Sequence, residues 1–338
     1  MDGTRVKKLI NDPDRVAGET IEGLSLAFPQ YLRQLGEWPC VMRCTSPQPG
    51  KVAIITGGGS GHEPMFAGFT GRGMADGSVA GNIFTSPPPP PIVELAKAVH
   101  GGAGILFIYG NYAGDVLNFD MASEILQDDK IPVETALVTD DVASAPPDRT
   151  AERRGIAGGL LVIKVAGAKA EEVGSDLAQV LAAARHANQN TRTMGVALSS
   201  CIIPASGRPI FDLGEDEMEI GMGIHGEPGV ERGKLKTAEE VAANMVDRIL
   251  ADLSFRRGDE VAVLVNGLGA TPLGELFIVF RSVSRLLRNA GLGICRAYVG
   301  NYVSSLEMAG CSVSIMRIDA ELKRLLLAPT ETPGLVQV

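Results

Sequence analysis

Two of the four histidines in this 338-residue chain lie inside glycine-rich segments. His62 is part of GGGSGHEP (residues 57–64), and His225 is part of GMGIHGEPG (221–229). Glycine lets a backbone turn sharply and approach a ligand closely, and a neutral imidazole can serve as a nucleophile or base near pH 7. We therefore predict a small polar substrate that is enclosed by backbone amides and acted on by His62 and His225.

The first glycine-rich segment follows an apolar run, as phosphate-binding loops do, but it departs from both common nucleotide patterns. It has no lysine of the GxxxxGK[ST] type, because His62-Glu63-Pro64 stands at that place, and it does not fit GxGxxG. A loop whose amides and Ser60 hold a small polyol or keto group fits the residues better. A glycine turn with a merely buried histidine is the alternative.

Two further side chains could take part in chemistry. His225 has only glycine and Ile224 beside it, so its Nε2 could reach into a cleft and attack a carbonyl. Metal ligation is the less favoured alternative, because few histidines lie near one another in the sequence. Asp115 follows a predicted strand and could either accept a hydroxyl proton or cap the next helix. Asp140-Asp141 is interpreted as a solvated turn with a helix cap rather than a metal site.

Composition narrows the class of protein. The chain is 45% hydrophobic with a net charge of −9 and a pI near 5.1. These values argue against nucleic acid as a partner and against a basic membrane-binding face, and no apolar run is long enough to span a bilayer. The five cysteines are scattered, Cys40 and Cys44 included, and we expect reduced, buried thiols in a cytoplasmic protein. Residues 1–8 do not have the character of a signal peptide.

Apolar runs and amphipathic segments alternate through the first half of the chain, which predicts a largely parallel sheet with helices on both faces. In such a sheet, ligands bind beyond the carboxyl ends of the strands, where the segments 56–64 and 109–115 fall. The Pro87–Pro91 run is interpreted as a rigid loop. The predicted strands are 52–56, 104–109, 133–138 and 160–165, and the predicted helices are 14–36, 116–126 and 169–188.

A second cycle of strands follows a polar interruption near 188–193. Thr237 with Glu240 forms a capping-box pattern that opens a helix to about 253. We predict two α/β domains, 1–190 and 191–338, each a largely parallel or mixed sheet flanked by helices. Apart from that helix, the second half has predicted strands at 193–198, 260–265 and 291–299 and a further helix at 273–289.

Four segments in order now support a resemblance. They are GGGSGHEP, GNIFTSP (81–87), NYAGDVLNF (111–119) and the segment around His225. Together they resemble the substrate-binding subunit of dihydroxyacetone kinase over nearly the whole chain. The resemblance implies a two-domain α/β homodimer that binds dihydroxyacetone or a similar short ketose.

The resemblance also implies roles for particular residues. The histidine matching His225 forms a covalent hemiaminal with the substrate carbonyl, and His62 and Asp115 contact hydroxyls and assist proton transfer. Substrate contacts through the backbone are implied for Gly59, Ser60 and Gly61. One position departs from the family, because Gly110 stands where a substrate-contacting lysine is usual. The space gained there could admit a tetrulose such as erythrulose.

The chain shows no nucleotide or metal site of its own, and phosphoryl transfer needs both nucleotide and metal ions. The resemblance implies that ATP or ADP, with Mg²⁺, is carried by a separate nucleotide-binding kinase subunit. A ketone-sensing regulator without turnover is the competing hypothesis, since a sensor could keep the same three residues for binding.

Overall fold

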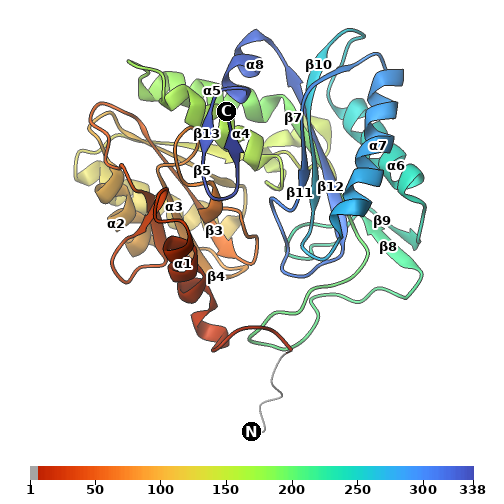
Figure 1. The fold of residues 1–338 in the computed structure, drawn as a ribbon, viewed down its shortest axis with the longest axis horizontal. Helices are drawn as coiled ribbons and strands as arrows, with labels where there is room; N and C mark the ends of the chain where they lie inside the picture. Colours follow the sequence, from red (N-terminus) through yellow and green to blue (C-terminus); the bar gives the residue numbers. More distant parts are fainter. Residues whose placement is uncertain (1–6) are drawn as a thin grey trace, which may run out of the picture.

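The computed structural model describes residues 7–338 and consists of two mixed β-sheets with helices packed on and between them (Figure 1). The expectation for residues 1–8 therefore lies largely outside the described residues. In the first sheet, the four neighbouring strands β4, β3, β5 and β6 run parallel and an antiparallel pair extends one edge. Its spatial order is β1 (Leu32–Gln34), β2 (Cys40–Arg43), β4 (Gly77–Ile83), β3 (Ala53–Ser60), β5 (Ile105–Gly110) and β6 (Val133–Val138).

The second sheet is mostly antiparallel, and only one of its strand pairs, β10 with β11, runs parallel. The predicted fold class, two mixed sheets flanked by helices, is confirmed, with this difference in strand direction. The spatial order is β11 (Gly293–Gly300), β10 (Glu260–Gly267), β12 (Gly310–Ile318), β7 (Thr191–Ala197), β8 (Glu217–Ile220) and β9 (Glu231–Lys234).

Helices cover both faces of the first sheet because its strands are apolar on both sides. Ile55 and Phe107 pack under α2 and α3, whereas their neighbours Ile54 and Leu106 pack under α4 and α5. Helices α6 and α7 cover the outer face of the second sheet. The helices are α1 (Val16–Ala27), α2 (Pro89–Val99), α3 (Ala113–Asp128), α4 (Gly159–Ala170), α5 (Leu177–Gln189), α6 (Ala238–Asp252), α7 (Leu273–Asn289) and α8 (Ala320–Leu326), with short 3-10 turns η1 (Pro13–Arg15), η2 (Ala67–Phe69) and η3 (Pro147–Glu152).

Helix α4 corrects the largest error of the sequence interpretation, which assigned 160–165 to a strand. All but one of its residues are buried, and its core cluster contains residues of both sheets, such as Leu106 and Leu264. A helix buried on every side shows no amphipathic period, so its apolar run cannot be told from a buried strand. The predicted helix over 169–188 correspondingly begins later, at Leu177, where Asp176 forms a capping box with Gln179.

Smaller predictions also change. The helix expected over 14–36 ends at Ala27, before Pro29, which lacks the N–H that a helix requires. The expected rigid loop at Pro87–Pro91 is half helix, because Pro89 opens α2, where its missing N–H costs nothing. Of the two cysteines that lie close together in the sequence, Cys40 is buried, as expected, whereas Cys44 is exposed.

The last residues of the chain return to the first half. Strands β13 (Thr330–Glu331) and β14 (Val336–Gln337) pair with each other, and the Glu331 N–H donates to the Arg72 carbonyl at 3.0 Å. The division into domains 1–190 and 191–338 stays a prediction. None of the helices in the described part combines the length and apolar character needed to cross a bilayer.

Candidate active site

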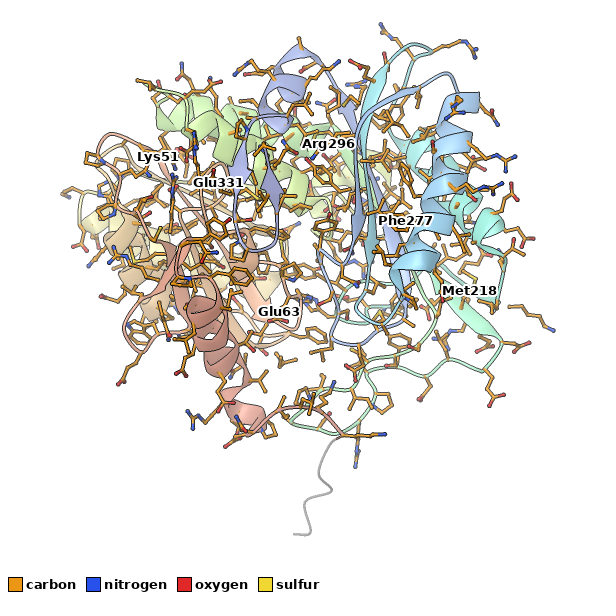
Figure 2. The ribbon with its side chains drawn as sticks, in the orientation of Figure 1. Lys51, Glu63, Met218, Phe277, Arg296 and Glu331 are labelled. Atoms are coloured by element: carbon orange, nitrogen blue, oxygen red, sulfur yellow. The ribbon has the colours of Figure 1, made fainter. Side chains whose placement is uncertain are left out.

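A cavity that is partly open to solvent lies between segments from both halves of the chain. Glu63, next to His62, marks this region in Figure 2, between the two halves of the molecule. Among the residues lining the cavity are five of the predicted ones, from segments far apart in the sequence: Gly59, His62, Gly110, Asp115 and His225.

The two histidines are in direct contact. The Nε2 atoms of His62 and His225 lie 3.0 Å apart, and their rings meet at 67°. Phe84 packs against both rings, with centroid separations of 5.0 Å from His62 and 5.2 Å from His225. Phe84 has a φ of 53°, a backbone conformation that is uncommon for a bulky residue and that marks functional sites.

Each imidazole is fixed through its other nitrogen. Nδ1 of His62 lies 2.8 Å from the Ser304 carbonyl, and Nδ1 of His225 lies 2.9 Å from Oε1 of Glu227. A carbonyl and a carboxylate can only accept, so both Nδ1 atoms carry protons. The Nε2 atoms of the two rings face each other, and a hydrogen bond between them requires one shared proton.

Burial and charge set the ionisation of this group. Burial and the neighbouring His225 lower the pKa of His62 to about 3, so His62 is a weak base in this arrangement. Burial alone would raise the pKa of Glu227, but its hydrogen bond to His225 and the charge of that ring outweigh burial and lower it to about 2. Glu227 is therefore a carboxylate at neutral pH.

Asp115 lies in the first turn of α3 rather than at its cap. The N-cap residue is Tyr112, and Asp115 accepts no backbone N–H of this helix among the described residues. Its Oδ1 is buried without a partner in residues 7–338. Burial raises the pKa of Asp115 to about 6, against the opposing effects of Ser86 and His225. A carboxylate of this kind can accept a proton near neutral pH.

The residues that were predicted to contact the substrate through their backbone do not all line the cavity. Gly59 lies in strand β3 and lines the cavity. Ser60 ends the same strand, and its hydroxyl donates to the Gly81 carbonyl at 2.7 Å. Neither Ser60 nor Gly61 is among the residues that line the cavity with His62. Gly110 ends β5, and a Cβ added there would lie 2.9 Å from the Tyr112 ring.

Sequence reasoning missed the segment between β11 and β12. The Ser304 N–H donates to the His62 carbonyl at 3.1 Å, and the Ser305 hydroxyl donates to the Ile224 carbonyl at 2.6 Å. This segment thus holds both histidine-bearing loops. Asn266, fully buried, holds it in turn by accepting from the Val303 N–H at 2.8 Å. Several of these contacts run through the backbone, so the residue types gave no signal.

The acidic pair at 140–141 was also misjudged, because both side chains are buried rather than solvated. Asp140 accepts the N–H groups of Ile156 and Gly158 at 2.8 Å, ahead of α4, and the N-cap of that helix, Gly158, has no side-chain cap, so the predicted helix cap is wrong as well. Asp141 instead pairs with Arg154 at 2.8 Å. Within residues 7–338, no group of three or more His, Cys, Asp or Glu side chains is placed to hold a metal ion.

Comparison with known proteins connects this geometry to a family. The chain is 48% identical over 327 residues to a D-erythrulose kinase of Mycolicibacterium smegmatis, covering 97% of this chain and 56% of that relative. It is 45% identical over 330 residues to the dihydroxyacetone-binding subunit of a PTS-dependent dihydroxyacetone kinase of Listeria innocua, covering 97% and 98%. The chain thus spans about half the length of the first relative and nearly all of the second.

A solved structure gives the same relationship. A dihydroxyacetone kinase operon co-activator superimposes with a TM-score of 0.89 at 32% identity, over 95% of this chain and 98% of that one. The Dak1 domain matches residues 22–334. The resemblance to substrate-binding subunits of dihydroxyacetone kinases is therefore confirmed, and the chain belongs to the Dak1 domain family.

Proposed function

We propose that this chain is the substrate-binding and catalytic subunit of a short-ketose kinase, with dihydroxyacetone as its first candidate substrate. The observation that carries the proposal is the contact between His62 and His225, with the unpartnered Oδ1 of Asp115 in the same cavity. A nucleophile, a proton carrier and a base thus line one cavity. The names of the two relatives, a D-erythrulose kinase and a dihydroxyacetone-binding subunit, agree with this chemistry.

Capture of the ketone would proceed by addition to its carbonyl. With the shared proton on His62, the lone pair of His225 Nε2 forms a bond to the carbonyl carbon while the π electrons move to the oxygen. The oxygen then takes that proton from His62 to give a hemiaminal. The captured imidazole is then a cation with its remaining N–H on Nδ1, where Glu227 accepts it. Glycerol has no carbonyl and cannot react in this way, so the step selects short ketoses by reaction rather than by shape.

Asp115 would serve in the following transfer. A hydroxyl of the captured ketone can donate to its free Oδ1, and the carboxylate takes the proton as the phosphoryl group arrives. General-base assistance of this kind contributes about 10²–10⁴-fold to a rate.

The phosphoryl donor belongs to another chain in this proposal. ATP or ADP, with Mg²⁺, would be carried by a nucleotide-binding kinase subunit that docks over the cavity and neutralises the charge of the transferred group. The chain itself would act as a homodimer in the cytoplasm, where its five free cysteines stay reduced.

A ketone sensor without turnover is the second candidate, and the likeness to an operon co-activator favours it. Capture by His225 is common to both candidates. Phosphoryl transfer distinguishes them, because a sensor binds the ketone but does not phosphorylate it with any nucleotide-carrying subunit.

The first test is native intact-protein mass spectrometry with dihydroxyacetone and, separately, erythrulose, using His225→Ala as the control. An adduct of the substrate mass on the parent protein and not on the variant supports capture. If neither ketone leaves an adduct under conditions where a related subunit shows one, covalent capture is refuted. Better retention of erythrulose would indicate that the site accepts a tetrulose, although the Tyr112 ring fills the space beside Gly110.

A further inference from the structure

The side chain of Tyr112 lies directly against the nucleophile. Its ring meets the His225 ring edge-on, with the centroids 4.7 Å apart at 76°, and it lines the same cavity. Tyr112 precedes α3 with an extended backbone (φ −122°, ψ 140°), which places it one turn before Asp115. The same turn of chain therefore brings two polar side chains to His225.

The hydroxyl of Tyr112 is buried, and it has no hydrogen-bond partner in the described part of the chain. Buried polar groups are nearly always hydrogen-bonded, so an exception requires an explanation. Burial and the negative charges of Glu227 and Asp141 raise the pKa of Tyr112 well above its usual value, which keeps its proton in place. Tyr112 thus offers a hydrogen-bond donor, whereas Asp115 Oδ1, also unpartnered, offers an acceptor.

Glycine at position 110 is part of this arrangement. A Cβ there would lie 2.9 Å from Cε2 of Tyr112 and 3.2 Å from the Gly155 carbonyl, so any side chain would press the ring away from its present place. Gly110 therefore allows the Tyr112 ring to lie where it does.

We propose that Tyr112 is a substrate-binding residue that determines specificity. Asp115 accepts from the hydroxyl on one side of the ketose carbonyl, and the Tyr112 hydroxyl binds the hydroxyl on the other side. This inference rests on the proposed capture of a ketone by His225. A ketose with a hydroxyl on each side of its carbonyl satisfies both unpartnered groups at once. A site built in this way discriminates against an analogue that lacks one hydroxyl, because a buried polar group is then left unpaired.

The experiment compares two ketones on one variant. Dihydroxyacetone has a hydroxyl on each side of the carbonyl, whereas hydroxyacetone has only one. Tyr112→Phe removes a single oxygen and should weaken capture of dihydroxyacetone by about tenfold, as the loss of one hydrogen bond does. Capture of hydroxyacetone should change by less than about twofold, because the variant removes a bond that this ketone does not make. Adduct fractions against ketone concentration, from native mass spectrometry, give both ratios.

Tyr298→Phe is the matched control. The hydroxyl of Tyr298 is also buried, but it donates to Gln337 Oε1 at 2.9 Å, and Tyr298 is not among the residues that line the cavity. This variant should leave the ratio between the two ketones unchanged. Equal weakening of both ketones by Tyr112→Phe, or no weakening of either, would overturn the inference while leaving capture by His225 intact. Absence of any adduct on the parent protein would instead remove the proposed function and the inference together.

Discussion

Replacing Glu227 by glutamine tests how His225 is prepared to capture a carbonyl. In the structure, Oε1 of Glu227 accepts from His225 Nδ1 at 2.9 Å, and Oε2 accepts from the His225 backbone N–H at the same distance. Capture leaves the imidazole positively charged, so the carboxylate stabilises the adduct more than the free histidine. Glutamine keeps one acceptor but loses the charge, and its NH₂ group then faces one of the two N–H donors.

The size of the effect follows from the kind of bond that is lost. A hydrogen bond to a charged group contributes about 1.5–3 kcal/mol. The Glu227 side chain is 30% exposed, so solvent screens part of this interaction and the low end applies. About 1.5 kcal/mol corresponds to roughly a tenfold weaker adduct. Because the pKa of Glu227 is about 2, the carboxylate is charged throughout the neutral range, and this factor should be constant above about pH 5.

The assay is a titration of the adduct fraction with dihydroxyacetone by native mass spectrometry. Glu63→Gln is the matched control, because Glu63 stands beside the other histidine but, among residues 7–338, its side chain accepts only from the Gly61 backbone N–H. We expect the control to capture the ketone within about threefold of the parent protein. If Glu227→Gln captures as well as the parent, or no worse than the control, the carboxylate does not prepare His225 and the reasoning fails.

Three further predictions concern the polar side chains of Asp115, Ser305 and Asp252. Burial raises the pKa of Asp115 from 3.8 to about 6, so the folded protein loses stability as pH rises from about 4 through about 6. Asp115→Asn should therefore stabilise the protein by about 3 kcal/mol at pH 8 and hardly at all at pH 4, as thermal unfolding can show. Ser305→Ala removes the donor to the Ile224 carbonyl and should cost about 1–2 kcal/mol of stability and weaken the adduct. A variant unchanged in both would contradict the role of the segment between β11 and β12. Asp252→Asn breaks a pair with the fully buried Arg153 and should lower the free energy of unfolding in urea by about 3–5 kcal/mol, while a loss under about 1 kcal/mol would show that the pair is dispensable.

Much of the first sheet could be predicted from the sequence. Strands β3 and β5 are apolar runs that end in glycine-rich turns, and in the structure they are parallel neighbours. The carboxyl ends of such strands meet at one edge, which brings the segment with His62 and the turn with Asp115 to one cavity. Local signals were also reliable where they involve capping, as with Thr237 and Glu240 at the start of α6.

The sequence could not show which elements lie between the two sheets. Helix α4 is apolar on every side because both sheets pack on it, and this removes the period that identifies a helix. The strand directions of the second sheet were equally hidden, since a strand buried on both faces has the same apolar composition in either direction.

The glycines beside His62 also have a packing role that their pattern did not suggest. A Cβ on Gly58 would lie 2.5 Å from the Phe66 ring, and one on Gly59 would lie 2.5 Å from the Thr85 backbone nitrogen. These glycines therefore allow other segments to pack closely against strand β3. Gly59 lies beside the segment that contains Phe84. The contact between the two imidazoles depends instead on Ser304 and Ser305, which hold one histidine loop each. Since these serines follow β11 in the second sheet, the position of that sheet against the first determines whether the two Nε2 atoms meet.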